Sequence, residues 1–273
     1  MIPAPFEYVR AGSAEEAIAL LGEHGDEAKL LAGGHSLLPL MKLRLATPSV
    51  LIDVGRVHDL SYVRDAGDHV AVGALTRHHD VETSDLLRRE APILSYAAGL
   101  VGDPQVRHRG TLGGSLAHGD AASDLPAVVL ALGGTLVARG PGGEREIAAD
   151  DFFLGFLETA LAPDELITEV RVPKAPGAGW SYQKFNRRAQ DWAIVGVAAV
   201  GDGRRGVALV HMGSVPLRAA GVEEAWQAGA SPAEAAARAD ESTDPPSDGN
   251  ASPEFRRHLA RVLTQRALEQ AQG

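Results

Sequence analysis

The hydrophobic pattern of the first 75 residues predicts short strands around one helix. Apolar or alternating runs flanked by turn residues are typical of strands, and they occur at residues 6–9, 29–31, 50–54 and 70–72. Ser13 and Glu16 have the spacing of a capping box, and the apolar positions that follow, through Leu21, recur with a helical period. This region therefore predicts alternating strands and helices.

The pattern between residues 85 and 172 predicts further helices and an antiparallel hairpin. Apolar residues between Asp85 and Val101 fall mostly on one helical face, and Pro92 is expected to break the segment into two helices. The run "LPAVVLAL" after Asp124 predicts a short buried helix. "GTLVARGPGGEREI" predicts a hairpin with Pro141-Gly142-Gly143 at its tip, and residues 166–172 alternate as a strand.

A segment rich in Pro and Gly, "VPKAPGAGW" at residues 172–180, predicts a domain boundary. Beyond it, three antiparallel strands are expected at residues 181–187, 193–200 and 206–211. Helical patterns follow at residues 219–227, 233–239 and 253–271. We therefore expect an α+β domain over residues 1–173 and a smaller domain of a three-stranded sheet and helices over residues 178–273.

Composition narrows the class of protein. The chain has 273 residues, a formal net charge of −10 and no cysteine. The negative charge argues against binding to nucleic acid or an anionic membrane. Without cysteine the chain has no disulfide, no thiol nucleophile and no thiolate ligand for an iron–sulfur cluster. No apolar run is long enough to span a membrane, and the first ten residues do not have the pattern of a signal peptide, so we expect a cytoplasmic protein.

Two glycine turns carry the chemical signal. "AGGHS" at residues 32–36 and "TLGGS" at residues 111–115 each follow a predicted strand or loop and precede an apolar run. Glycine pairs let backbone N–H groups converge on an anion without a Cβ in the way, although a single pair most often marks only a tight turn. Neither turn matches the Rossmann or P-loop pattern. Two such turns in one domain favour a dinucleotide-like ligand whose diphosphate lies between two loops.

These turns and their surroundings resemble a known family. "KLLAGGHSLLPLMKLRL" with "LIDV", and "GDPQVRHRGTLGGSLAHGDAASDLPAVVLAL", closely resemble the FAD-binding medium subunits of carbon monoxide dehydrogenases. More broadly they resemble the flavoprotein parts of the xanthine dehydrogenase family of molybdenum hydroxylases. The resemblance continues through "GWSYQKFNRRAQDWAIVG" to "VPLRA". It implies a two-subdomain α+β FAD-binding cradle of the vanillyl-alcohol-oxidase type, followed by a C-terminal sheet and helices.

The resemblance also implies a set of FAD-binding residues. The first diphosphate loop would be Ala32, Gly33, Gly34, His35 and Ser36, with Leu30, Leu31 and Leu37 beside it. The second would be Thr111, Leu112, Gly113, Gly114 and Ser115. Further cofactor contacts would come from Val101, Asp124, Ile167, Lys184 and Trp192. A cation at Lys184 near the flavin would raise its reduction potential.

Several of these positions have a plainer interpretation that the residues alone leave open. Asp124 suits the first turn of a helix, Lys184 suits a solvated strand, and Trp192 suits a hydrophobic core. Arg107 and Arg109 flank the second turn, where they would brace the loop, neutralise the diphosphate or face a partner.

Two other groups of side chains resemble a metal site and a catalytic triad, but their patterns predict neither. His78-His79-Asp80 is expected to be a solvated turn at a helix start, since no third metal ligand is identifiable. The residue types of a catalytic triad occur at Ser115, His118, Asp120 and Asp124, but not in the nucleophile-elbow pattern.

The function implied by the resemblance is electron transfer within a complex. The chain would be the FAD-binding subunit of a heterotrimeric molybdenum hydroxylase. It would accept electrons from a [2Fe–2S] small subunit, beside a molybdopterin-containing large subunit, and pass them to an external acceptor. A dimer of heterotrimers is the assembly that the family suggests. A free-standing flavin oxidoreductase of the same fold and a flavin-free docking subunit are the alternatives. The residues do not identify the substrate of the complex or the electron acceptor.

Overall fold

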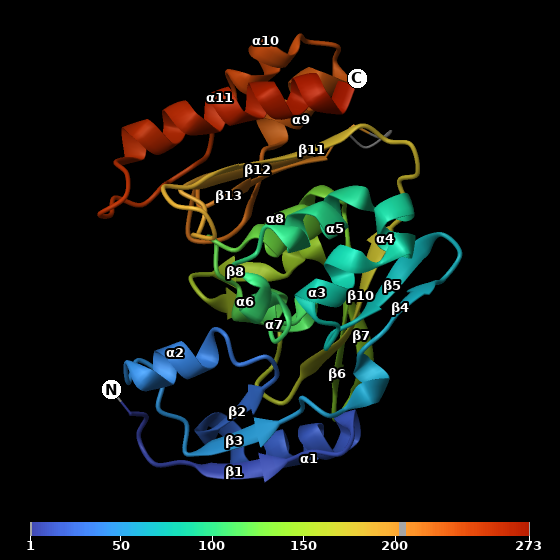
Figure 1. Ribbon diagram of the computed structural model, residues 1–273, viewed down its shortest axis with the longest axis vertical. Helices are drawn as coiled ribbons and strands as arrows, with labels where there is room; N and C mark the ends of the chain where they lie inside the picture. Colours follow the sequence, from blue (N-terminus) through green and yellow to red (C-terminus); the bar gives the residue numbers. More distant parts are fainter. Residues whose placement is uncertain (1, 202–205, 273) are drawn as a thin grey trace.

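The computed structural model describes residues 2–201 and 206–272, so the outer limits of the two expected domains, residues 1 and 273, lie outside the described residues. The elements form three tiers along the longest axis (Figure 1). The N-terminal sheet lies at one end and the C-terminal helices lie at the other.

The first tier is a parallel sheet of strand order β1–β3–β2 with α1 packed on it. Its elements are β1 (Glu7–Arg10), α1 (Ala14–His24), η1 (Gly25–Glu27), β2 (Ala28–Leu31), α2 (Leu37–Lys42), β3 (Val50–Asp53) and η2 (His58–Leu60). The hydroxyl of Ser13 accepts a hydrogen bond from the Glu16 N–H, so the predicted helix start is confirmed. The Glu16 carboxylate accepts from the Gly12 N–H, one residue before the position that a capping box requires.

The second tier is an antiparallel sheet of order β4–β5–β10–β6–β7. Its strands are β4 (Val63–Asp65), β5 (His69–Gly73), β6 (Thr135–Gly140), β7 (Gly143–Ala148) and β10 (Leu166–Pro173). The predicted hairpin is formed by β6 and β7, with Pro141 and Gly142 between them. The register of β10 against β6 shifts between Ile167 and Glu169, so Thr168 lies at a bulge.

Six short α-helices, one 3₁₀ helix and a small hairpin accompany this sheet in the described residues. They are α3 (His78–Thr83), α4 (Asp85–Glu90), α5 (Pro92–Gly99), α6 (Pro104–Arg107), α7 (Leu112–His118), α8 (Asp124–Ala131), η3 (Ala149–Asp151), β8 (Phe153–Gly155) and β9 (Glu158–Thr159). The break predicted at Pro92 separates α4 from α5, because proline is favoured at the first turn of a helix and not in its interior. Every residue of α8 is buried, as the run "LPAVVLAL" predicts.

The third tier is an antiparallel sheet of order β11–β12–β13–β14. Its elements are β11 (Trp180–Phe185), β12 (Val195–Val200), β13 (Gly206–Val210), β14 (Leu217–Arg218), α9 (Ala220–Gln227), α10 (Pro232–Ala236) and α11 (Pro253–Gln272). The two-residue strand β14 extends the predicted three-stranded sheet by one strand.

The strand β12 is buried on both faces. Val195, Val197 and Ala199 belong to the core shared with α11, while Ala198 and Val200 belong to the core shared with α8. This alternation follows from the two-residue period of a strand. The C-terminal sheet is therefore sandwiched between its own helices and the second tier.

The predicted α+β architecture is confirmed, since only the first sheet is parallel and the other sheets are antiparallel. Among the described residues, no helix combines the length and apolarity that crossing a membrane requires.

Candidate functional site

The two glycine turns, about eighty residues apart in sequence, meet in the structure. Gly33 lies against the backbone of the segment that leads into the second turn. A Cβ placed on Gly33 would lie 2.3 Å from the Arg109 carbonyl oxygen and 2.8 Å from the Gly110 Cα. Only glycine permits this approach, because no real side chain tolerates such contacts. The structure therefore brings together the two turns that the sequence singles out.

The first turn presents unused hydrogen-bond donors. The chain leaves β2 at Leu31 and passes through residues 32–36 into α2, with Gly34 at a φ of +77°. Among the described residues, the backbone N–H groups of residues 33–36 have no hydrogen-bond acceptor. No acidic residue occurs from Leu30 to Leu37. Backbone N–H groups that have no acceptor within the protein are available to bind an anion.

The second turn uses most of its N–H groups within the protein. Thr111 caps α7 by accepting a hydrogen bond from the Gly114 N–H, at 3.1 Å. The N–H groups of Leu112 and Gly113 donate to the carbonyls of Thr76, at 3.0 Å, and Ala74, at 2.8 Å. The second turn is thus held by hydrogen bonds to the segment between β5 and α3. Gly33 of the first turn packs against the residues that directly precede the second turn.

His78 is buried behind this junction, so the prediction of a solvated turn is wrong for this residue. Its side chain is 2% exposed, and its Nε2 lies 3.2 Å from the Ser115 Oγ. Burial, assisted by the positive charges of His35, Arg77 and Arg107, lowers the pKa of His78 to about 4. No metal-binding cluster of His, Cys, Asp or Glu occurs in the part of the chain that the structure describes.

The arginines beside the second turn have different roles. The Arg107 guanidinium pairs with Glu82 at 2.8 Å and donates to the Val101 carbonyl at 3.2 Å, so it braces the segment between α5 and α6. The Arg77 guanidinium donates to the Arg109 carbonyl, the same oxygen that Gly33 approaches. The Arg109 charge, after burial, contributes to lowering the pKa of His35, so it acts on the first turn.

A second cluster joins the second tier to the third. Asp124, in the first turn of α8, pairs with the Lys184 ammonium at 2.9 Å and accepts a hydrogen bond from the Tyr182 hydroxyl. Burial raises the pKa of Asp124, while Lys184 and Tyr182 act in the opposite direction. The Lys184 side chain is 7% exposed and also donates to the Leu100 carbonyl at 3.0 Å. The solvated-lysine interpretation is therefore wrong, and the helix-first-turn interpretation of Asp124 is correct.

The remaining predicted residues lie in three places. Val101 is half-buried beside Leu100, whose carbonyl holds Lys184. Ile167 is buried in β10 and precedes Thr168, whose carbonyl accepts from the Ala74 N–H. Because the Ala74 carbonyl in turn accepts from the second turn, β10 is connected to that turn by hydrogen bonds.

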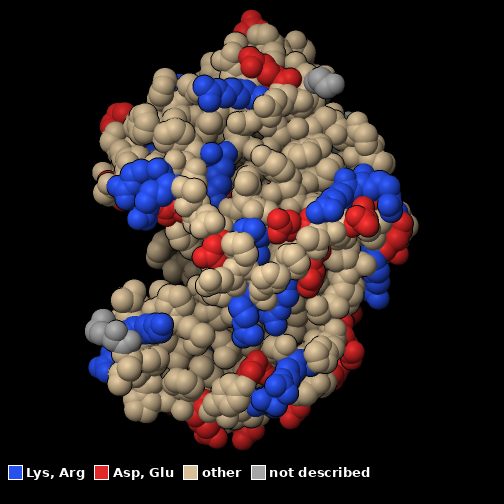
Figure 2. Space-filling view, viewed as in Figure 1, with Lys and Arg blue, Asp and Glu red and all other residues tan. Residues whose placement is uncertain are grey.

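Trp192 is 55% exposed, so the core interpretation is wrong. It lies in the β11–β12 connection and lines a cavity of about 330 Å³ with Asp120, Arg187, His211 and Arg256. Among the described contacts, none joins Trp192 to either glycine turn. Figure 2 shows a hollow in one side of the molecule, between the level of α2 and the level of this connection, with Lys and Arg side chains on both rims.

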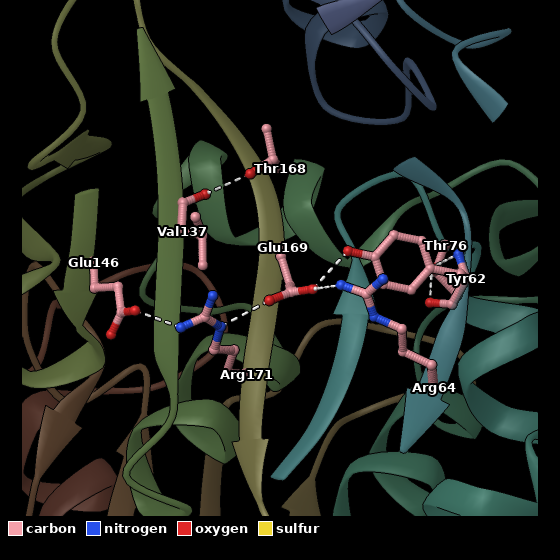
Figure 3. A network of polar contacts seen from close by, with 8 residues as sticks. All are labelled: Tyr62, Arg64, Thr76, Val137, Glu146, Thr168, Glu169 and Arg171. Atoms are coloured by element: carbon pink, nitrogen blue, oxygen red, sulfur yellow. Dashed lines mark hydrogen bonds and ion pairs between the residues drawn. The ribbon is translucent and has the colours of Figure 1, made fainter. Parts of the chain in front are cut away.

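A polar network behind the second turn was missed by the sequence analysis (Figure 3). The buried Glu169 carboxylate accepts hydrogen bonds from the Tyr62 hydroxyl at 2.7 Å, Arg64 at 2.8 Å and Arg171 at 2.7 Å. The Thr76 hydroxyl bonds to the backbone of Tyr62, and the Thr76 carbonyl holds Leu112. Burial and the Glu169 hydrogen bond raise the pKa of Tyr62. The only sequence signal was a single acid in the apolar run "LITEVRVP".

The residues at the two turns are suited to the negatively charged diphosphate of a flavin dinucleotide. The first turn supplies free N–H donors, the turns contain no acid, and arginines surround them. Residues 4–175 match the family of the FAD binding domain in molybdopterin dehydrogenase, and residues 180–271 match the CO dehydrogenase flavoprotein C-terminal domain. The chain therefore belongs to this family of FAD-binding flavoproteins, and the predicted resemblance is confirmed.

Individual relatives match most or all of the chain. The carbon monoxide dehydrogenase medium chain of Afipia carboxidovorans is 40% identical over 284 residues, covering 100% of this chain and 99% of that one. The corresponding medium chain of Hydrogenophaga pseudoflava is 49% identical over 201 residues, or 73% of this chain and 70% of that one.

Solved structures are similarly close. A chain of carbon monoxide dehydrogenase from Hydrogenophaga pseudoflava superposes with a TM-score of 0.96 and 42% identity, covering 100% of this chain and 99% of that one. A chain of quinoline 2-oxidoreductase from Pseudomonas putida 86 superposes with a TM-score of 0.90 and 33% identity, with the same coverage. The chain is thus an oxidoreductase subunit of the carbon monoxide dehydrogenase type with an FAD-binding domain.

Proposed function

We propose that this chain is the electron-transferring FAD subunit of a heterotrimeric molybdenum hydroxylase. It accepts electrons from a [2Fe–2S] small subunit, beside a molybdopterin-containing large subunit, and passes them to an external acceptor. The bound flavin supplies the capacity to take up electrons singly and release them in pairs. The chain itself holds the cofactor and sets its surroundings.

The contact between Gly33 and the Arg109–Gly110 backbone is the observation that carries this proposal. It brings two distant turns together, and within the described part of the chain the N–H groups of residues 33–36 beside this contact have no acceptor. We assign the FAD diphosphate to this site. The residues assigned to it are Leu30, Leu31, Ala32, Gly33, Gly34, His35, Ser36, Leu37, Thr111, Leu112, Gly113, Gly114 and Ser115.

We assign the flavin end of the cofactor to Val101, Asp124, Ile167, Lys184 and Trp192. Both Asp124 oxygens already accept hydrogen bonds from the protein, so Asp124 acts chiefly by holding Lys184 and Tyr182. Lys184 is then held at the end of α5, beside Val101, with a carboxylate that offsets its charge. Electrons are proposed to leave through an exposed edge of the ring near Trp192.

The domain limits and the assembly belong to the same proposal. The FAD-binding domain covers residues 1–173, and the C-terminal domain covers residues 178–273. The complex is a dimer of heterotrimers in the cytoplasm. The absence of cysteine supports the partner assignment, because a thiolate-ligated [2Fe–2S] cluster requires another chain.

Co-expression with adjacent genes that encode a molybdopterin protein and a cysteine-rich ferredoxin-like protein tests the proposal. We expect a co-purified complex whose flavin absorbance bleaches when the substrate of the large subunit is added. The flavin should be released on denaturation and identified as FAD by chromatography. A chain that purifies alone with FAD and oxidises a substrate of its own would contradict the subunit role. A chain that neither binds FAD nor melts at a higher temperature with FAD would contradict the cofactor role.

A further inference from the structure

Within the described part of the chain, one ring nitrogen of the buried His78 has a hydrogen-bond partner and the other has none. Nε2 faces the Ser115 hydroxyl, and Nδ1 is buried with no partner among the described residues. The ring has little freedom to turn. The His78 backbone N–H donates to the Gly110 carbonyl at 3.0 Å, and a Cβ on Gly110 would lie 2.6 Å from the His78 Cδ2. The imidazole edge therefore lies directly on the junction of the glycine turns.

The unpaired Nδ1 decides which tautomer the ring adopts. The low pKa of the His78 side chain keeps the imidazole neutral at pH 7. A neutral imidazole carries a proton on one of its two nitrogens. A proton on Nδ1 would create a buried N–H donor with no acceptor, which native structures rarely contain. An unprotonated Nδ1 leaves only an unused lone pair, which is less unfavourable. The proton therefore belongs on Nε2, where the Ser115 oxygen accepts it.

We propose that His78 is a positioning residue whose Nε2–H donates to the Ser115 Oγ and so leaves the Ser115 hydroxyl proton free for an anionic oxygen at the glycine turns. This inference rests on the proposed function, since the anion meant is the FAD diphosphate. In the opposite tautomer Nε2 carries no proton, and the Ser115 hydroxyl would donate its hydrogen bond to Nε2. Only oxygen lone pairs of Ser115 would then face the anion, which repels them. His78 itself contacts Ser115 and not the anion.

The tautomer is measured first, in the chain without FAD. Selective ¹⁵N-histidine labelling with two-bond ¹⁵N–¹H correlation distinguishes Nδ1 from Nε2 by chemical shift and coupling pattern. A matched spectrum of His78→Gln identifies the His78 signals among those of the ten histidines. We expect a protonated Nε2 and an unprotonated Nδ1 at pH 7. A proton on Nδ1 would overturn the inference whether or not FAD binds.

FAD titration of the apoprotein is the second test, with Ser115→Ala, His78→Leu, the double variant and His78→Gln. We expect each of the first two variants to weaken FAD binding about tenfold, the effect of one lost hydrogen bond. The double variant should be no weaker than either, because both changes remove the same bond to the anion. His78→Gln should bind FAD nearly as the wild type does, since its amide N–H replaces Nε2–H.

Melting temperatures without FAD separate folding from binding. A His78→Leu chain that melts normally and binds FAD normally would overturn the inference, and so would a double variant about a hundredfold weaker than the wild type. An equal loss of FAD affinity in His78→Gln and His78→Leu would also overturn it. The glutamine amide would then fail to replace the Nε2–H donor, as expected if His78 only fills space. Failure of the wild-type chain to bind FAD would instead overturn the proposed function together with this inference.

Discussion

The Cα of Gly33 lies against the carbonyl of Arg109, in a contact that leaves no space for a methyl group. This relationship joins the first sheet to the helical part of the second tier, because Gly33 follows β2 and Arg109 follows α6. It also determines which properties of the protein a substitution at Gly33 affects. A side chain there meets the protein's own backbone, so it affects folding as well as any ligand.

We therefore expect Gly33→Ala to lower the free energy of unfolding by about 2 to 3 kcal/mol, because the backbone at Arg109 and Gly110 must move. FAD affinity should fall with it. Urea unfolding and FAD titration measure the two effects. Gly22→Ala is the matched control, since no atom lies within 4 Å of a Cβ at that helical position. It should stabilise the chain by about 0.5 to 1 kcal/mol. Wild-type stability in Gly33→Ala would contradict the contact.

Gly114→Ala tests the cap of α7. A Cβ at this position would lie 2.6 Å from the Thr111 Oγ1 and would meet no other close atom. We expect a loss of about 1 kcal/mol, similar to that of Thr111→Ala, because both changes remove the same cap. The double variant should lose little more than either single variant in urea unfolding. Full additivity of the two losses would argue against this account.

The buried pair of Asp124 and Lys184 predicts an asymmetric response to substitution. Asp124→Asn leaves the Lys184 ammonium buried without a carboxylate, and we expect a loss of about 3 to 5 kcal/mol in the free energy of unfolding. Combining it with Lys184→Met should recover part of that loss, because no charge then remains buried. Chemical denaturation measures both. A double variant less stable than Asp124→Asn alone would contradict the pairing.

The low pKa of His78 predicts how stability depends on pH. The unfolded chain binds a proton to this histidine below about pH 6.5, and the folded chain does so only near pH 4, so protonation favours unfolding in between. His78 alone should lower the free energy of unfolding by about 2 kcal/mol from pH 7.5 to pH 5. The charges of His35, Arg77 and Arg107 add to the effect of burial in lowering this pKa.

His78→Gln removes this titration and should flatten the decline over the same pH range in urea unfolding. His79→Gln is the control for loss of a histidine at a neighbouring position. Equal slopes in wild type and His78→Gln would show that His78 is not buried in the neutral form.

Local signals in the sequence were sufficient for most of the elements. Pro92 separates two helices because a proline ring does not fit in the interior of a helix. Ser13 caps the start of α1 because its hydroxyl accepts a hydrogen bond from an N–H of the first turn. The two glycine turns were also recognisable, because each has a glycine pair and ends in a serine, and the two occur in one predicted domain. These features depend on neighbours within a few residues, so a single sequence contains them.

The tertiary structure alone decided which of these residues are buried and what they touch. His78 was expected in solvent and is buried, Lys184 was open to a solvated interpretation and is buried, and Trp192 was open to a core interpretation and is exposed. Their surroundings come from segments far along the chain, such as Asp124 for Lys184 and Gly110 for His78. Sequence determined that two glycine turns exist. Only the packing of the tiers determined that they meet, because that contact depends on how separate sheets and helices bury their apolar faces against one another.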